Sequence, residues 1–436
     1  MRRSIFETQF LVNEAESLLT RLNTIKPFAL NMPMVMAAAV SDDALKGITN
    51  LLIKGYKELK QKINEYIQWT RKTNPYTSTD HAQAKYSILK LRFNALLDQL
   101  DIFADVLSQR AEHDTGVWMA GMDVLAEDAI KLDGNYYEAP PLICFLERGH
   151  GAAIRRARTR LPGGDLNPVG VIQVPRERMV GSGIASSLIH EVGHQGAALL
   201  DLVETLREDI RFQQQQSPHK LSWECFYRWI SEIVADFWAT AHLGIGATLG
   251  LMSVVSLPKY FIFRINLNDP HPFPWIRVKL SLAFGNALYP HMQWERYEKL
   301  WERMYPANSA DENTQVLMEQ LQLTIPHFVK MVINHQPPKL NGKRLCEVFP
   351  YNSRQPAHLQ YLFNLWRFSP DQISKAPPSL VFAVIGQARA DANISAVKEN
   401  QLLSKWLTNW AFFSSENRSK KELPRVYKEL KHLVNN

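Results

Sequence analysis

The sequence predicts an α+β protein that is predominantly α-helical and contains one small β-sheet. Apolar residues recur at helical spacing over most of the chain, and one short region of β-branched runs, bounded by prolines and glycines, interrupts that pattern. The chain has 436 residues, of which 46% are hydrophobic and 21% are charged. This composition excludes global disorder, and the length suits about two to three domains.

Helices are expected on both sides of the β-rich region. In the N-terminal part, apolar residues at spacings of three and four predict a helical hairpin and one further helix, over 44–72, 79–110 and 116–132, which we expect to pack together as a bundle. The C-terminal part predicts helices over 310–335, 354–366, 370–376 and 378–412, with a last short helix ending near residue 435.

The β-rich region begins after Pro140-Pro141. Its three short runs predict a sheet of about three strands, within 142–148, 151–160 and 169–175. The second run carries a basic patch made of Arg155, Arg156, Arg158 and Arg160. A solvated outer face is the simpler interpretation of this patch, and recognition of an acidic substrate or partner is the alternative.

Charge, cysteine content and hydropathy restrict the class of protein. The net charge of +7 is mild for this length and does not indicate nucleic-acid binding. Three widely separated cysteines argue against a disulfide framework and favour a reducing compartment. The uncharged run Phe237–Pro258 contains three glycines and ends on a proline, so we expect a buried helix and connector and no membrane span. We therefore expect a cytoplasmic protein, or one exported without a cleavable signal.

The first indication of a chemical function is an H-E-x-x-H motif at residues 190–194. Ser182 is a candidate N-cap, and apolar residues at helical spacing follow it. On a helix, His190 and His194 lie one turn apart on one face, so both imidazoles can reach a single metal ion. Glu191 is offset by about 100° around the helix axis, where a general base can take a proton from metal-activated water.

A third ligand is expected on a second helix, which runs from about 222 to 244. Glu232 and Asp236 lie one turn apart there among aromatic and aliphatic residues, and unpaired charges on such an apolar helix would be costly. Two histidines and Glu232 make the three-protein-ligand set of a catalytic zinc site, and Asp236 is placed to accept the second ring N–H of a ligand histidine. Competing third ligands are Glu204, Glu208 and Glu224.

A further segment supplies candidates for stabilising an oxyanion. DPHPFPWIRV at 269–278 contains His271 and Arg277, and its prolines would stiffen the loop that presents His271. Tyr260 and Tyr289 are weaker candidates, and a rigid turn with a surface arginine is the structural alternative for this segment.

Together these motifs resemble the gluzincin metallopeptidases. H-E-x-x-H followed by E-x-x-A-D, and then by H-P-x-x-x-x-R, is similar to the group that includes the CAAX prenyl proteases and the heat-shock-induced membrane proteases. The resemblance covers roughly residues 165–290. It implies a zincin-like domain, zinc held by His190, His194 and Glu232, and Glu191 as the general base. It also implies that His271 and Arg277 lie near the active site.

The predicted domains follow from the position of the motifs and from the change, after Pro140-Pro141, from helical spacing to short β-branched runs. We expect a helical N-terminal domain over 1–140, a zincin-like catalytic domain over 141–300 and a helical C-terminal domain over 301–436. In such a site the substrate backbone pairs with an exposed sheet edge, which either 169–174 or 151–160 could supply.

The predicted function is that of a zinc-dependent metalloendopeptidase acting on a protein or peptide. The alternative is a catalytically lapsed zincin-fold scaffold or a regulatory zinc-binding protein. Glu191 disfavours this alternative, because a structural zinc site needs no general base.

Overall fold

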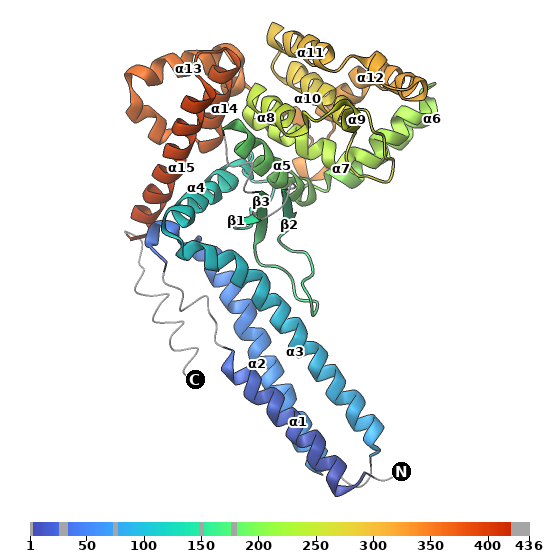
Figure 1. The fold of residues 1–436 in the computed structure, drawn as a ribbon, viewed down its shortest axis with the longest axis vertical. Helices are drawn as coiled ribbons and strands as arrows, with labels where there is room; N and C mark the ends of the chain where they lie inside the picture. Colours follow the sequence, from blue (N-terminus) through green and yellow to red (C-terminus); the bar gives the residue numbers. More distant parts are fainter. Residues whose placement is uncertain (1–2, 26–33, 73–76, 148–151, 176–180, 420–436) are drawn as a thin grey trace.

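The computed structural model describes residues 3–25, 34–72, 77–147, 152–175 and 181–419. Helices dominate these residues and one small sheet accompanies them, which confirms the predicted predominantly helical α+β class. Figure 1 shows a long helical arm projecting from a larger body, with the sheet at the junction between them.

The arm is a bundle of three long helices. They are α1 (Ile5–Thr24), α2 (Asp42–Lys72) and α3 (Thr79–Ser108). The first begins at a capping box in which Ser4 and Glu7 satisfy each other's backbone N–H groups, and Ser78 caps the third. The predicted hairpin over 44–72 and 79–110 is confirmed. The third helix of the bundle is α1, and not the helix predicted over 116–132, most of whose buried apolar residues belong to the apolar cluster of the body. One apolar cluster fills the bundle, including Leu18, Ile48 and Phe93.

The body contains the remaining helices. They are α4 (His113–Ala129), α5 (Ser182–Leu199), α6 (Leu202–Gln216), α7 (Lys220–Leu243), α8 (Ile245–Val255), α9 (Lys259–Ile262), α10 (Pro274–Leu288), α11 (Met292–Met304), α12 (Glu312–Asn334), α13 (Pro356–Phe368), α14 (Pro378–Ala390) and α15 (Ala396–Ser419). Short 3₁₀ helices connect some of these elements, at η2 (Met36–Ala38), η3 (Gln109–Ala111), η5 (Ala307–Ser309), η6 (Pro338–Leu340), η7 (Leu345–Glu347), η8 (Asn352–Arg354) and η9 (Pro370–Lys375).

Most predicted helices of the body are present, with three differences. The stretch 378–412 is not one helix, because a turn at Asp391–Ser395, with Ala392 at a positive φ of 59°, separates α14 from α15. The stretch 370–376 forms a 3₁₀ helix and not an α-helix. The predicted last helix, ending near residue 435, lies outside the described residues.

The sheet contains β1 (Leu142–Glu147), β2 (Ala153–Arg155) and β3 (Gly170–Pro175). Their order is β1-β3-β2, with β3 parallel to β1 and antiparallel to β2. The three predicted strands are therefore confirmed, and β3 is the central strand. Of the two predicted edges, only the 151–160 segment supplies one, through its short strand β2.

Both faces of the sheet are covered, which explains the nearly continuous apolar runs of β1 and β3. Successive residues of a strand point to opposite faces. Ile143 and Val171 accordingly join the apolar cluster of the arm, whereas Cys144 and Ile172 join the main cluster of the body.

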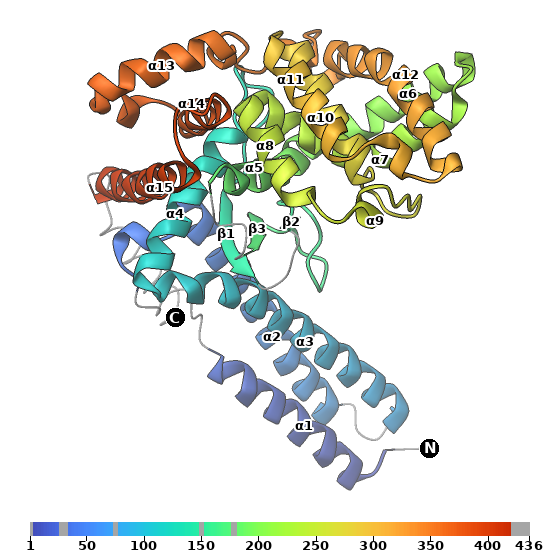
Figure 2. The same ribbon diagram turned by 45° about the horizontal axis from the view of Figure 1, so that its top comes forward.

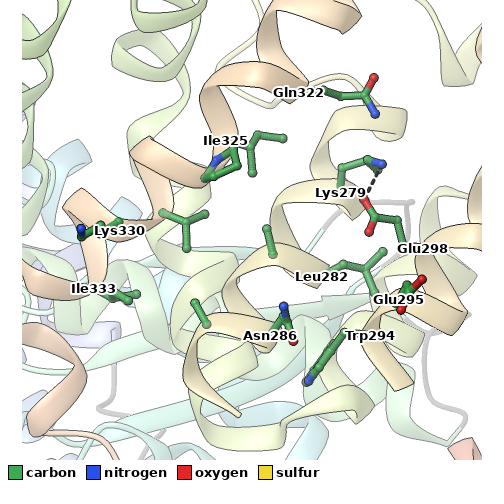
Figure 3. A pocket seen from close by; sticks show the side chains of 14 residues that line it. Lys279, Leu282, Asn286, Trp294, Glu295, Glu298, Gln322, Ile325, Lys330 and Ile333 are labelled. Carbon is green, nitrogen blue, oxygen red and sulfur yellow. Dashed lines mark ion pairs between the residues drawn. The ribbon is translucent and has the colours of Figure 1, made fainter. Parts of the chain in front are cut away.

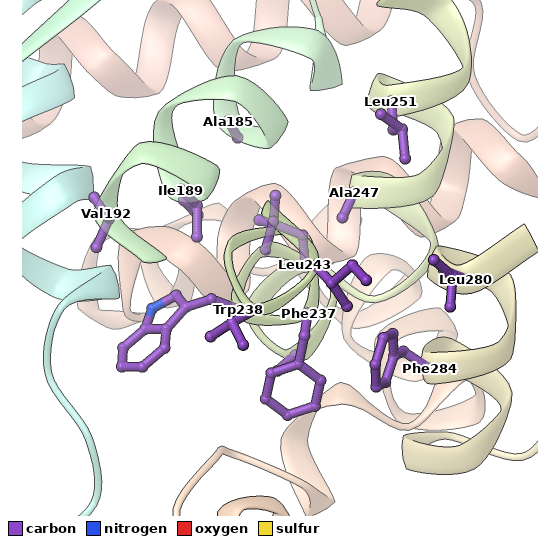
Figure 4. Packing of buried hydrophobic residues seen from close by; sticks show 14 of the residues in the cluster. Ala185, Ile189, Val192, Phe237, Trp238, Leu243, Ala247, Leu251, Leu280 and Phe284 are labelled. Atoms are coloured by element: carbon purple, nitrogen blue, oxygen red, sulfur yellow. The ribbon is translucent and has the colours of Figure 1, made fainter. Parts of the chain in front are cut away.

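The main cluster of the body surrounds α5 and α7. Figure 4 shows side chains of α5, α7, α8 and α10 packed together, with Ile189, Trp238 and Phe284 among them. Helices α5 and α7 approach closely at Gly193. A Cβ atom added there would lie 2.9 Å from the Ala235 Cα atom and 2.8 Å from Trp238 Cβ, so only glycine fits without a shift. Trp238 also donates a hydrogen bond to the Ala129 carbonyl. The close approach at Gly193 sets the distance between the two helices that carry the motifs.

The C-terminal helices share this cluster. Val384 of α14 and Leu407 of α15 belong to the same group of buried side chains as Ile189 of α5, and Figure 2 shows α14 and α15 beside α4 and α5. The predicted domain boundaries at 140 and 300 stay a prediction.

The uncharged run Phe237–Pro258 is divided in the structure. It forms the end of α7 and the whole of α8, with Gly244 at a positive φ of 56° between them. Within the described ranges, no helix combines the length and the hydropathy needed to cross a bilayer.

Candidate metal centre

The H-E-x-x-H motif lies on α5, in its buried central part. The helix begins at Ser182, and its N-cap is Gly181 at a positive φ of 58°, so the predicted cap at Ser182 is wrong. The side chain that satisfies this helix start comes from far along the chain: Glu399 of α15 accepts hydrogen bonds from the Ser182 N–H and Ser182 hydroxyl groups. Asn400 accepts another from the Gly181 N–H group.

The predicted third ligand lies on α7, which extends from Lys220 to Leu243 close to the predicted bounds. A separate helix, α6, connects the end of α5 to α7 through the short loop 217–219. The competing carboxylates lie elsewhere. Glu204 and Glu208 are exposed on α6, and Glu204 pairs with Arg207. Glu224 pairs with Arg211 and Arg228.

His190, His194 and Glu232 converge to form one cluster. Ligand atoms of the three residues all lie within 4.8 Å of one another. His190 Nε2 lies 3.2 Å from Glu232 Oε2, and His194 Nε2 lies 3.4 Å from Glu232 Oε1. Two ligand atoms bound at about 2.0–2.1 Å to one tetrahedral ion are about 3.3 Å apart. The three residues could therefore hold a metal ion, and two histidines with one glutamate are a donor set that zinc accepts.

Other polar side chains hold the two histidines by their opposite ring nitrogens. Asp236 Oδ1 lies 2.8 Å from His190 Nδ1, one turn along α7 from Glu232. Ser231 Oγ lies 3.4 Å from His194 Nδ1. When the rings are neutral and Nδ1 carries the proton donated to these oxygens, Nε2 of each ring can present its lone pair to a metal ion, as it would once Nε2 no longer donates to Glu232. The sequence analysis assigned Asp236 this position and missed Ser231, which adjoins Glu232 in the sequence.

His271 approaches the cluster from the loop before α10. Its Nε2 lies 3.1 Å from Glu232 Oε2, and its side chain is 47% exposed. Asp269 fixes this loop by accepting hydrogen bonds from both the backbone N–H and the Nδ1 of His271, each shorter than 3 Å. Sequence reasoning missed Asp269. The signal that could have found it is that an aspartate in a turn often accepts a hydrogen bond from the backbone N–H two residues further on.

Arg277 lies on the first turn of α10 and is directed at Asp236. Its Nε and Nη2 atoms donate to the two carboxylate oxygens of Asp236 at 2.6 and 2.8 Å. The bidentate geometry fixes both side chains and balances their charges. The structure therefore brings Arg277 into the site through Asp236, with Nη2 3.5 Å from His190 Nδ1. The tyrosine candidates lie elsewhere: Tyr289 is buried and donates to the Ala241 carbonyl, and Tyr260 is 70% exposed.

The electrostatics of the cluster follow from buried groups of opposite charge. Burial opposes ionisation of Glu232, but hydrogen bonds from His190, His194 and His271 outweigh it and hold the pKa of Glu232 far below its usual value. Burial likewise opposes protonation of His190, yet the charge of Asp236 raises the pKa of His190 to about 9. A carboxylate that stays ionised at all physiological pH values suits a cation site.

Glu191 differs from the ligands in both position and charge state. It is 5% exposed and lines a cavity of about 130 Å³ together with His190, His271 and Arg277, and it lies outside the group of three ligands. Burial raises the pKa of Glu191, although the neighbouring histidines oppose the shift. A raised pKa makes the carboxylate a stronger proton acceptor, as a general base requires.

A larger cavity lies away from these residues, between α10, α11 and α12. Its volume is about 570 Å³. Figure 3 shows its polar side, where the nearly buried Lys279 pairs with Glu298, and its apolar side, which includes Ile325 and Ile333. Lys279 also pairs with Glu302 at 2.6 Å, so the buried cation is already compensated.

Compared with models of known protein families, with curated proteins and with solved structures, the chain gives no match. Assignment of a function to the cluster therefore rests on its own residues and their geometry.

Proposed function

We propose that the chain is a zinc-dependent metallopeptidase of the gluzincin type, in which α5, α7 and the small sheet form a zincin-like catalytic unit. One observation carries the proposal. Two histidines of α5 and Glu232 of α7 converge at metal-ligand separations, and Glu191 lies buried beside them, free of the ligand set. A protein or peptide substrate and a cytoplasmic location are part of this proposal.

His190, His194 and Glu232 would hold the ion. A zinc ion bound there would supply Lewis-acid polarisation and make water nucleophilic at neutral pH. Glu191 takes the proton of the attacking water as its oxygen adds to the scissile carbonyl carbon. It then delivers a proton to the amine nitrogen as the C–N bond breaks. Glu191 is only 5% exposed in the wall of this cavity, which limits contact of its carboxyl group with bulk water.

The roles of His271 and Arg277 are separated by their contacts. Arg277 uses its Nε and Nη2 atoms on Asp236, so it acts as a positioning residue for the carboxylate that holds His190. His271 is half exposed beside the cavity, and its Nε2–H can be redirected from Glu232 to a developing oxyanion. Loss of one such donor lowers kcat by about 10²–10³.

The test begins with zinc quantitation on the purified full-length protein. We expect about one zinc ion per chain, and cleavage within a peptide library that a chelator abolishes. E191Q should retain the zinc and lose cleavage by at least about 10²-fold, because a positioned general base contributes about that much. E204Q, which changes an exposed carboxylate on α6, is the matched control and should behave like the wild type.

Two outcomes would contradict the proposal. Full activity of E191Q would exclude the assigned general base. Stoichiometric zinc without any cleavage that depends on Glu191 would favour the alternative, a scaffold or regulatory protein that only binds zinc.

A further inference from the structure

The short strand β2 forms an edge of the sheet. It pairs with β3 on one side, and none of the strands that the structure describes pairs with its other side. The backbone groups along such an edge can bind a segment of another chain in extended conformation. Figure 1 shows β2 at the side of the sheet, below α5.

This edge begins at the cavity of the candidate metal centre. Ala152, which directly precedes β2, lines the same cavity as His190, Glu191 and His271. A peptide paired along β2 would therefore enter the cavity as it passes Ala152. The edge and the catalytic residues are thus placed to act on the same extended chain.

Arg155 lies at the other end of β2. It is opposite Val171 of β3 and one position beyond Ile154, whose partner is Ile172. Since successive side chains alternate between faces, Arg155 lies on the Val171 face of the sheet, and Ile154 lies on the Ile172 face. The Arg155 side chain is exposed, and within the described residues it forms no ion pair and no hydrogen bond. Arg156, the next residue, is exposed as well.

The other two arginines of the basic patch are differently placed. Arg158 follows the end of the strand at a positive φ of 64°, and its guanidinium group already contacts Glu138. Arg160 donates to the Gly164 carbonyl within the turn that follows. Of these residues, only Arg155 combines a position on the strand with a free charge.

We infer that Arg155 selects an extended peptide substrate carrying an acidic side chain, an inference that rests on the proposed peptidase function. A peptide residue directly opposite Arg155 on the free edge of β2 has its Cβ atom about 4.5–5.5 Å from that of Arg155, and opposite charges at this position attract. Arg155 is three residues from Ala152, or about 10 Å along a strand. The acidic residue therefore lies about three positions from the peptide residue that faces Ala152.

The experiment uses the zinc-loaded full-length protein and one cleavable peptide. A single glutamate, glutamine or lysine is placed in turn at each of the four positions on either side of the cleaved bond, and kcat/KM is measured for each peptide. We expect glutamate to exceed lysine by about fourfold or more at one position, because a cross-strand charge pair changes an affinity about two- to fivefold in either direction. The preference should weaken as ionic strength rises.

Charge reversal identifies the residue responsible. R155E should reverse the preference at that position, so that lysine exceeds glutamate. R158E makes the same change of charge three residues away, off the strand, and should keep the wild-type preference.

The outcomes separate this inference from the proposed function. Cleavage with the same preference in R155E as in the wild type overturns the role of Arg155 and leaves the peptidase proposal intact. An equal reversal in R158E also overturns it, since a general electrostatic field would then explain the preference. Absence of any cleavage that depends on Glu191 overturns both.

Discussion

Asp236 accepts a hydrogen bond from the ring of His190 at 2.8 Å and thereby directs the opposite ring nitrogen of that histidine towards Glu232. The same carboxylate accepts two hydrogen bonds from Arg277. One side chain of α7 thus connects a residue of α5 with a residue of α10, and the orientation of a proposed zinc ligand depends on all three helices.

The first prediction concerns this carboxylate. D236N should weaken zinc binding by about 10- to 100-fold, because loss of a charged partner lowers the basicity of His190 and leaves the cation of Arg277 uncompensated. Competition with a chromophoric chelator measures the dissociation constant. E224Q removes a carboxylate of the same helix that pairs with surface arginines, and it should bind zinc like the wild type. Unchanged affinity in D236N would show that Asp236 does not support the site.

The second prediction concerns the close approach of α5 and α7 at Gly193. G193A places a methyl group within 3 Å of the Ala235 Cα atom and of Trp238 Cβ, so the two helices must separate. We expect a loss of about 1–3 kcal/mol in the free energy of unfolding, together with weaker zinc binding. Urea denaturation and chelator competition measure the two effects.

G183A is the matched control for this substitution. Gly183 lies on the same helix, and an added Cβ there would be 3.9 Å from Ser253 Oγ, an ordinary contact. If G193A and G183A were equally stable and bound zinc equally well, the spacing of α5 and α7 would not determine the metal centre.

The third prediction concerns the pH dependence of stability through His242. This histidine is buried against Trp238 and Phe349, and neither of its ring nitrogens has a hydrogen-bond partner within the described residues. Burial lowers the pKa of His242 to about 3, with a smaller contribution from Arg354. The unfolded chain binds this proton below about pH 6.5 and the folded chain only below about pH 3. The contribution of the neutral His242 ring to the free energy of unfolding is therefore fully present above about pH 6.5. It is lost progressively as the pH falls from about 6.5 towards about 3.

At about pH 5 this group alone should reduce the free energy of unfolding by about 2 kcal/mol relative to neutral pH. H242L cannot bind the proton and should lose correspondingly less stability over the same interval. Urea denaturation of both proteins in the presence of a chelator, at about pH 5 and about pH 7.5, isolates the effect from metal release. Equal losses in the two proteins would mean that His242 is already hydrated or protonated in the folded state.

The fourth prediction concerns the cap that α15 supplies to α5. E399A removes the carboxylate that accepts from the backbone and hydroxyl groups of Ser182, so we expect a loss of about 1–2 kcal/mol in stability. K398A, at the exposed neighbouring position, should have little effect. Thermal unfolding of the metal-free proteins distinguishes the two. A stable E399A variant would show that the start of α5 needs no partner from the C-terminal helices.

The sequence alone determined the elements in which local pattern is decisive. Helical spacing of apolar residues located α2, α3 and α12, and short β-branched runs located the three strands. The spacing of His190 and His194, and of Glu232 and Asp236, placed each pair on one helix face, because a helix of known period fixes which residues share a side.

Only the tertiary structure decided which of these elements meet. The central position of β3, the bidentate contact of Arg277 with Asp236 and the cap that Glu399 provides to α5 all join residues far apart in the sequence. Local periodicity carries no information about such pairs. Their geometry follows from how the apolar faces of whole helices and strands fill a shared core, and that packing depends on the entire chain.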